Sequence, residues 1–421
     1  MFKFLTKGLF RDKSRSLFPI LTIAAGVMLT VLMYSWMNGF ATMTLRENAK
    51  FSTGHVKVMT RAYEKLSDQK PLDLALLGTE SLQENLQAEY PDITWLPRIY
   101  FGGLLDLPDV NGETLTQGEV MGMAVDLFSN KTEIDLLNLE EAIIDGTLPT
   151  QKGEIIITKE IAEKMSIKLN DTVTIISSTM FGSLTMNNFK VVGTVLFGVL
   201  AMDRGAVIID ISDARYMLDM EDGASEILGL LSKYDEAKTY EISANFNAKY
   251  SDENDEYSSL MRPLREQNNL DFLLASMDQR LGMMIFIFVF IMSLVLWNAG
   301  LMNGIRRYGE IGVRLAIGEN KGHIYRMMIF ESLIIGLAGT ILGTIVGLIF
   351  AYILQYNGID ISSLMKDAKM IMSAKMQAQV NTTSYIVGFL PGVLASVLGA
   401  IISGIGIYKR NTAQLFKELE T

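Results

Sequence analysis

Few side chains in this sequence are suited to catalysis. The chain has no cysteine and only two histidines, His55 and His323, so neither thiolate chemistry nor a histidine-based metal centre is expected. No Gly-x-x-x-x-Gly-Lys-[Ser/Thr] loop that could cradle a nucleotide phosphate occurs. The carboxylates are scattered, as on a solvated surface. We therefore predict no catalytic residue, no metal site and no cofactor in this chain.

The segment best suited to binding is residues 306–321, RRYGEIGVRLAIGENK, which lies between two apolar runs. It contains four arginine or lysine residues and two glutamates, and they are interleaved with Ile311, Val313, Leu315 and Ile317. Gly318 then has the position of a helix stop. We interpret the segment as a short helix beneath the membrane that a soluble partner grips. The alternative interpretation is a basic loop that only sets membrane topology.

Four apolar stretches would position this segment. Each is long enough to cross a bilayer as a helix, and they comprise residues 17–45, 281–305, 327–356 and 385–408. The first follows basic residues like a signal peptide, but its apolar run is too long for one, and we expect it to be retained. The predicted fold is therefore an α-helical membrane protein with four transmembrane helices.

Charge predicts which segments stay in the cytoplasm. Residues 1–16, the loop 306–326 and the tail 409–421 carry five, five and three Lys or Arg, while residues 46–280 carry 21 basic and 39 acidic residues, a net charge of −18. Short basic segments remain inside, and long acidic domains are exported. We thus expect both termini and the loop 306–326 inside the cell, and residues 46–280 outside the membrane. So acidic a domain also argues against nucleic acid as a partner.

The exported region has the pattern of a mixed α/β domain inserted between the first and second spans. Alternating strands, such as 154–158 and 172–177, are separated by helical stretches such as 133–144. Apolar spacing extends both flanking spans as a helical stalk. Residues 1–16 resemble an amphipathic helix, and methionines in the outer loop 357–384 favour an interfacial helix over a copper site.

Small residues recur on one face of each of the last two spans. Gly336, Gly339, Gly343 and Gly347 share a face of the third span, and in the fourth Gly388, Gly392, Ser396, Ala400 and Gly404 recur every four residues. This spacing lets helix backbones approach closely. We predict membrane helix packing at Gly339, Gly343, Gly347, Gly388 and Gly392.

The segment Glu310-Ile311-Gly312-Val313-Arg314-Leu315-Ala316-Ile317-Gly318, with Glu331-Ser332 after it, resembles the coupling region of ABC-transporter permeases of the FtsX/MacB/LolC–LolE family. The order of elements in the exported region also resembles the outer domain of that family. The resemblance implies that the region docks on an ATPase. The implied coupling residues are Glu310, Ile311, Gly312, Val313, Arg314, Ala316 and Gly318.

A hairpin between residues 172–177 and 189–195 carries the apolar residues Met180, Phe181, Leu184 and Met186. In lipoprotein-releasing permeases a hairpin at the equivalent place, called the hook, recruits the periplasmic carrier. The resemblance therefore implies that Met180, Phe181 and Leu184 contact a carrier. The alternative is a tip that packs on the neighbouring lobe, and the proline expected in a hook is absent.

The resemblance implies a permease subunit that is not itself an enzyme. ATP and Mg would bind a separate ATPase subunit, and a second permease copy or paralogue would complete the complex. ATP hydrolysis would move the periplasmic domain, a mechanism called mechanotransmission, and the first implied activity is the release of lipoproteins from the inner membrane. One alternative is MacB-like export of a peptide, toxin or lipid with a periplasmic adaptor protein. Another is an ATPase-driven regulator of an envelope enzyme.

Overall fold

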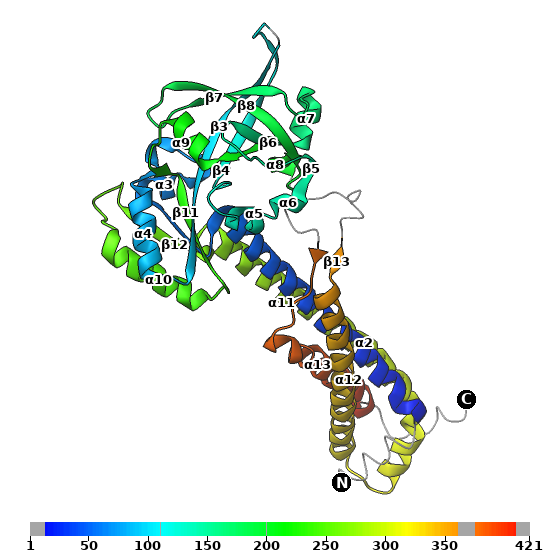
Figure 1. Ribbon diagram of the computed structural model, residues 1–421. Coiled ribbons are helices and arrows are strands. Elements are labelled where there is room, and N and C mark those ends of the chain that lie inside the picture. Colours follow the sequence, from blue (N-terminus) through cyan, green and yellow to red (C-terminus); the bar gives the residue numbers. More distant parts are fainter. Residues whose placement is uncertain (1–12, 110, 199, 361–374, 410–421) are drawn as a thin grey trace. The chain divides into compact units, whose positions relative to one another are not determined.

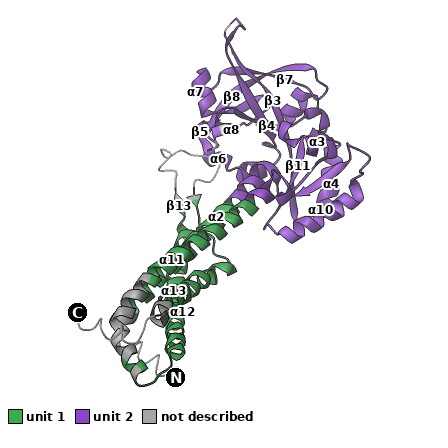
Figure 2. Ribbon diagram, turned by 180° about the vertical axis from the view of Figure 1, so that it is seen from behind, with its two compact units in different colours: residues 1–43, 274–359, 376–421 green, residues 44–273, 360–375 purple. Residues whose placement is uncertain are grey.

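The computed structural model describes residues 13–109, 111–198, 200–360 and 375–409, and these form two compact units (Figure 2). One unit contains the long helices, and the other is a large α/β domain between the first helix and the later ones (Figure 1). The predicted fold class is thereby confirmed. Of the two predicted interfacial segments, 1–16 and 357–384, residues 1–12 and 361–374 lie outside the described residues.

Within the described residues, four helices are long and apolar enough to cross a membrane. They lie in α2 (Lys13–Asn48), α11 (Leu270–Ala316), α12 (Lys321–Asn357) and α13 (Phe389–Lys409). The predicted spans at 17–45, 281–305 and 327–356 fall inside the first three of these helices. The fourth begins later than predicted, because the short 3-10 helix η6 (Thr382–Tyr385) precedes it.

The helical unit is packed through its small residues. A Cβ atom on Gly343 would lie 2.5 Å from the carbonyl oxygen of Ala24, and one on Gly339 would lie 2.8 Å from the Cβ of Ile23. Glycine is therefore what allows α12 to approach α2 so closely. Just before α13, a Cβ at Gly388 would lie 2.7 Å from Val27 of α2.

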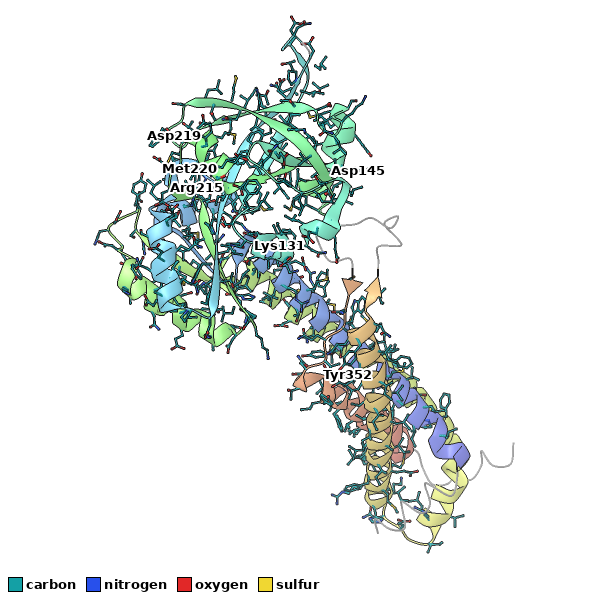
Figure 3. All side chains as sticks on the ribbon, viewed as in Figure 1. Lys131, Asp145, Arg215, Asp219, Met220 and Tyr352 are labelled. Carbon is teal, nitrogen blue, oxygen red and sulfur yellow. The ribbon has the colours of Figure 1, made fainter. Side chains whose placement is uncertain are left out.

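A short segment before α13 is attached to α2 by polar contacts. The amide of Gln379 donates to the carbonyl oxygen of Ser35 over 2.8 Å, and the Asn38 side chain donates to the Gln379 carbonyl over 3.0 Å. Gly39 leaves room for the backbone of Gln377. Nearby, the hydroxyl groups of Tyr352 on α12 and Tyr385 hydrogen-bond; Figure 3 labels Tyr352.

The α/β unit has a first lobe built on an antiparallel sheet. Its strand order is β12-β1-β11-β3, with bounds Ser259–Pro263, Val56–Thr60, Glu226–Leu231 and Ile93–Pro108. Helices α4 (Thr79–Glu89) and α10 (Glu236–Tyr250) pack on it around Trp95, Ile227 and Phe246. The flanking elements are α3 (Arg61–Lys65), β2 (Leu76–Leu77) and β10 (Gly223–Ala224).

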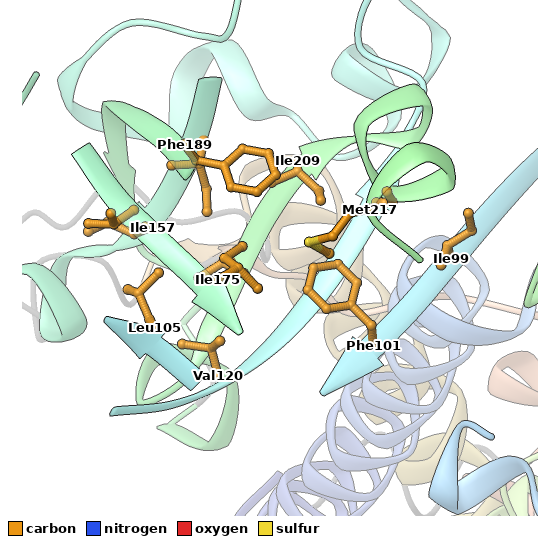
Figure 4. Packing of buried hydrophobic residues seen from close by; sticks show 14 of the residues in the cluster. Ile99, Phe101, Leu105, Val120, Ile157, Ile175, Phe189, Ile209 and Met217 are labelled. Atoms are coloured by element: carbon orange, nitrogen blue, oxygen red, sulfur yellow. The ribbon is translucent and has the colours of Figure 1, made fainter. Parts of the chain in front are cut away.

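The second lobe is a sheet that closes on itself. Hydrogen bonds connect β3 to β4, β4 to β9, β9 to β6, β6 to β8, β8 to β7 and β7 back to β3. The bounds are β4 Thr114–Val125, β6 Glu154–Thr158, β7 Thr172–Ser178, β8 Leu184–Val195 and β9 Ala206–Asp210. Side chains such as Phe101, Ile175 and Phe189 fill the interior (Figure 4). This ring is a small filled barrel.

Shorter elements cover the barrel. They are α5 (Thr132–Leu136), α6 (Leu139–Ala142), β5 (Ile143–Gly146), α7 (Lys159–Met165), α8 (Leu200–Asp203) and α9 (Ile211–Leu218). The predicted single helix over 133–144 is wrong. Asn138 adopts a left-handed conformation with φ 54° between α5 and α6, and the chain becomes strand β5 at Ile143.

Candidate functional site

The predicted coupling segment is not a separate helix. Helix α11 continues without a break from the second span to Ala316, because Gly309 and Gly312 alone do not stop a helix. It ends where Gly318 has φ +96°. There the Gly318 amide donates to Leu315 O over 3.1 Å and the Glu319 amide to Arg314 O over 3.0 Å. These two hydrogen bonds form a Schellman motif.

The next helix starts almost at once. Asn320 caps α12, since its side-chain oxygen accepts the Gly322 amide over 3.1 Å. The turn between α11 and α12 is therefore short and held by hydrogen bonds on both sides. The last six residues of the predicted loop, 321–326, belong to the first turns of α12.

Apolar side chains at this turn point into solvent. Ile317 is 81% exposed and Val313 is 51% exposed, and Arg314 is also exposed. An apolar residue presented on a rigid, capped turn beside charged residues suits a protein partner. Of the other predicted coupling residues, Gly312 is part of α11. The side chains of Glu310, Ile311 and Ala316 are outside the part of the chain that the structure describes.

The structure places the residues predicted to contact a carrier in two environments. Met180 is only 8% exposed, and its amide donates to Leu218 O over 2.9 Å. The prediction is wrong for Met180, because this side chain belongs to the barrel core. Phe181 and Leu184 are each 72% exposed. Leu184 is the first residue of β8, so only a compact turn separates β7 from β8.

Leu184 shares a face of β8 with Met186, two residues further on, and this face belongs to an apolar band on the outside of the barrel. In the sheet register Leu104 pairs with Ile176, and Ile176 pairs with Met186. Residues directly opposite each other lie on the same face of a sheet, so Leu104 and Met186 share the outer face. Met121, diagonal to Leu104 across β3 and β4, is 55% exposed, and Met186 is 59% exposed.

A second hairpin, which the sequence reasoning missed, extends the barrel. Strands β3 and β4 remain paired out to Pro108 and Thr114, whereas β7 accompanies β3 only as far as Asp106 (Figure 1). At its tip Asp109 accepts hydrogen bonds from the amides of Asn111 and Glu113, both 2.8 Å, and these hold the pKa of Asp109 below its usual value. The Asp-Val-Asn-Gly sequence at this turn was the available signal.

Known protein families match nearly the whole described chain. Residues 16–243 match the family model described as the MacB-like periplasmic core domain, and residues 282–412 match the FtsX-like permease C-terminal model. This chain belongs to the FtsX/MacB/LolC family of ABC-transporter permeases. The family resemblance predicted from the coupling segment is thus confirmed, and the protein is a multi-pass transmembrane permease.

Curated relatives of this permease include lipoprotein-releasing system transmembrane proteins LolC. The one from Xylella fastidiosa is 22% identical over 354 residues, which cover 81% of this chain and 77% of the relative. The one from Haemophilus influenzae is 21% identical over 339 residues, or 78% and 76% of the two chains. The crystal structure of the periplasmic region of MacB from Actinobacillus actinomycetemcomitans aligns with TM-score 0.34 and 11% identity, over 50% of this chain and 89% of that one.

Proposed function

We propose that this permease is the membrane subunit of a transporter in which a separate ATPase, bound at the turn after α11, drives movement of the outer domain. The observation that carries the proposal is α11 itself. It runs as one helix of 47 residues from the α/β unit at Leu270 through a candidate span to Ala316. At 1.5 Å per residue it is about 70 Å long, more than twice the thickness of the hydrocarbon layer.

The proposed partner is an ABC ATPase that carries the ATP and Mg. Ile317 and Val313 offer it an exposed apolar anchor, and Arg314 offers a charge at the rim. A rigid turn suits this role because a force applied to it is not absorbed by a loose loop. Hydrolysis then takes place on the partner, and the permease is not itself an enzyme.

We propose lipoprotein release from the cell inner membrane, with the outer domain in the periplasm, as the transported step. Two features support it. The curated relatives carry the name of lipoprotein-releasing proteins, and the outer domain presents the apolar band of Leu104, Met121 and Met186. Such a band could receive an acylated cargo or the apolar surface of a periplasmic carrier.

A second permease subunit, identical or a paralogue, completes the proposed complex. In the most apolar stretch of α11, only 11% is buried by the rest of the chain. The corresponding shares are 28%, 33% and 44% in the other three spans that the structure describes. Phe286 and Phe290, which are exposed and one helical turn apart, offer that span a face for a neighbouring helix.

A second candidate function is MacB-like export of a peptide, toxin or lipid with a periplasmic adaptor. The compact turn between β7 and β8 favours it, because Met180 is packed in the core and no extended hook is formed there. Copurification separates the candidates. A lipoprotein or its carrier supports release, and an adaptor with an outer-membrane channel supports export.

The test is reconstitution of the permease and its ATPase in proteoliposomes loaded with a lipoprotein. We expect ATP-dependent appearance of the lipoprotein in the soluble fraction when the carrier is present. Ile317→Asp should abolish ATPase association while leaving the melting temperature unchanged, because the side chain is 81% exposed. The matched control is Leu77→Asp, which charges an exposed leucine in the α/β unit, 62% exposed against 81% for Ile317. Normal ATPase association by Ile317→Asp would refute the proposed contact.

A further inference from the structure

The end of α2 enters the α/β unit in an unusual helical form. After Asn48 the helix widens into the π-helical turn η1 (Ala49–Thr53), which closes with the Gly54 amide donating to Ala49 O over 3.0 Å. Gly54 then has φ 60°, and the chain continues into β1. The last carbonyl groups of any helix lack partners within the helix, and here they are enclosed by the domain.

Side chains from β1, β3 and the segment before α11 donate hydrogen bonds to these carbonyls. Arg98 Nη1 donates to Phe51 O over 3.1 Å, and the Tyr100 hydroxyl donates to the same oxygen over 2.9 Å. The next carbonyl, that of Ser52, accepts from Lys57 Nζ over 3.2 Å. The one after it, that of Thr53, accepts from Gln267 Nε2 over 3.2 Å.

The cationic partners are themselves buried in ion pairs. Arg98, with no exposed surface, makes two hydrogen bonds of 2.9 and 2.8 Å to Glu133 of α5, the helix that follows Lys131 in Figure 3. Lys57, 2% exposed, pairs with the fully buried Glu226 over 3.1 Å. Ion pairs at this depth are costly to desolvate and require complete hydrogen bonding.

The charges in this cluster do not cancel among themselves. Lys70 also pairs with Glu226, so in the described residues Lys57, Lys70 and Arg98 form their ion pairs with two carboxylates, Glu133 and Glu226. The carbonyl end of a helix carries a partial negative charge, which favours cations placed against it. The η1 carbonyls therefore add partial negative charge next to the cations of the cluster.

The same cluster reaches the start of the other long helix. Gln267, only 5% exposed, lies just before α11, and the neighbouring Asn268 side chain donates to Ser52 Oγ over 2.9 Å. Ala49 of η1 packs with Leu264 and Leu270 in one buried apolar cluster. The end of α2 and the beginning of α11 are thus joined within the α/β unit.

We propose that four residues, Lys57, Arg98, Tyr100 and Gln267, form a clamp on η1. This clamp transmits the movement of α2 to both lobes of the outer domain. Arg98 and Tyr100 lie on β3, which belongs to the first lobe and to the barrel, and Lys57 lies on β1 of the first lobe. The four are positioning residues, and their role in transmission rests on the proposed function.

The sharpest probe is Tyr100→Phe, which removes one hydroxyl and its hydrogen bond to Phe51 O. The matched control is Tyr63→Phe. Tyr63 is buried in the same cluster and its hydroxyl donates to Glu226 over 3.2 Å, but within the described residues no hydrogen bond joins it to η1. Both variants lose one buried hydroxyl, so a general loss of stability would affect them alike.

Hydrogen exchange of the purified full-length permease in nanodiscs tests the clamp directly. Tyr100→Phe should speed exchange of the amides of residues 49–54 about fivefold, the effect of one lost hydrogen bond, and Tyr63→Phe should leave them at the wild-type rate. Equal exchange in the two variants would overturn the proposal.

The reconstituted complex then tests transmission. For Tyr100→Phe we expect ATP hydrolysis close to the wild-type rate and a loss of about fivefold in lipoprotein release, while Tyr63→Phe changes neither. Retained release despite faster exchange in residues 49–54 would overturn transmission by the clamp. If the wild-type complex shows no ATP-driven release, the proposed function fails, and the exchange result alone then decides whether η1 is clamped.

Discussion

At the scale of single residues, Glu226 should make the outer domain sensitive to acid. Burial disfavours its carboxylate, but Lys57 and Lys70 together hold the pKa of Glu226 below its ordinary value of 4.5. A lowered pKa in the folded state adds stability above pH 4.5, and that stability is lost as the pH falls below it. We expect unfolding midpoints in urea to drop steeply between about pH 5 and 3.

The variant Glu226→Gln should remove this dependence on acid. At pH 7 it leaves Lys57 buried without its carboxylate, so we expect a loss of about 3–5 kcal/mol in the free energy of unfolding. Glu256→Gln is the control, because its pair with Lys65 is 68% and 62% exposed and surface pairs contribute only about 0–1 kcal/mol. If the urea midpoint of Glu226→Gln falls with pH as steeply as that of the wild type, Glu226 is not the source of the acid sensitivity.

Residue-level features of this kind could not be predicted from the sequence. The carboxylates of the exported region were interpreted as a solvated surface, yet Glu133 and Glu226 are 1% and 0% exposed. Their partners are distant in the chain, since Glu133 pairs with Arg98 and Glu226 with Lys57. Whether a charged residue is buried depends on which strands pair in the fold. The residues next to it in the sequence do not reveal that pairing.

At the scale of elements, local chemistry decided which predictions succeeded. The strand predicted at 154–158 coincides with β6. It ends at Thr158, which caps α7 by accepting a side-chain hydrogen bond from the Ile161 amide. Strand β3 was missed. Its Pro97, Gly102 and Gly103 are unfavourable in a strand, and only pairing with β11, β4 and β7 imposes the conformation.

Between elements, the contact of α12 with α2 should depend on Gly343. In Gly343→Ala the new methyl group would lie 2.5 Å from Ala24 O and 2.8 Å from Val27 Cβ. Neither a backbone carbonyl nor a Cβ atom can rotate away, so the helices must separate, and we expect a loss of about 1–3 kcal/mol. Thermal unfolding in detergent measures it, with Gly282→Ala as control, since a Cβ there meets nothing within 4 Å. Equal melting temperatures for the two variants would argue against close packing at Gly343.

At the scale of the whole molecule, the proposed mechanism requires α11 to act as one strut from Leu270 to the turn at Gly318. Gly282 allows this to be tested without removing a contact, because it lies inside α11 with open space around it. Gly282→Pro removes a helical hydrogen bond and kinks or breaks the helix at a cost of about 3 kcal/mol. Gly282→Ala strengthens the helix by about 1 kcal/mol at the same position.

We expect Gly282→Pro to assemble with the ATPase and hydrolyse ATP, because the coupling turn lies at the far end of α11, but to lose lipoprotein release. Gly282→Ala should keep both activities. The measurement is the number of lipoproteins released for each ATP hydrolysed in proteoliposomes. If Gly282→Pro releases as many lipoproteins per ATP as the wild type, force does not travel along α11. The clamp on η1 would then have to receive that force through α2 alone, and Tyr100→Phe in the Gly282→Pro background would show whether it does.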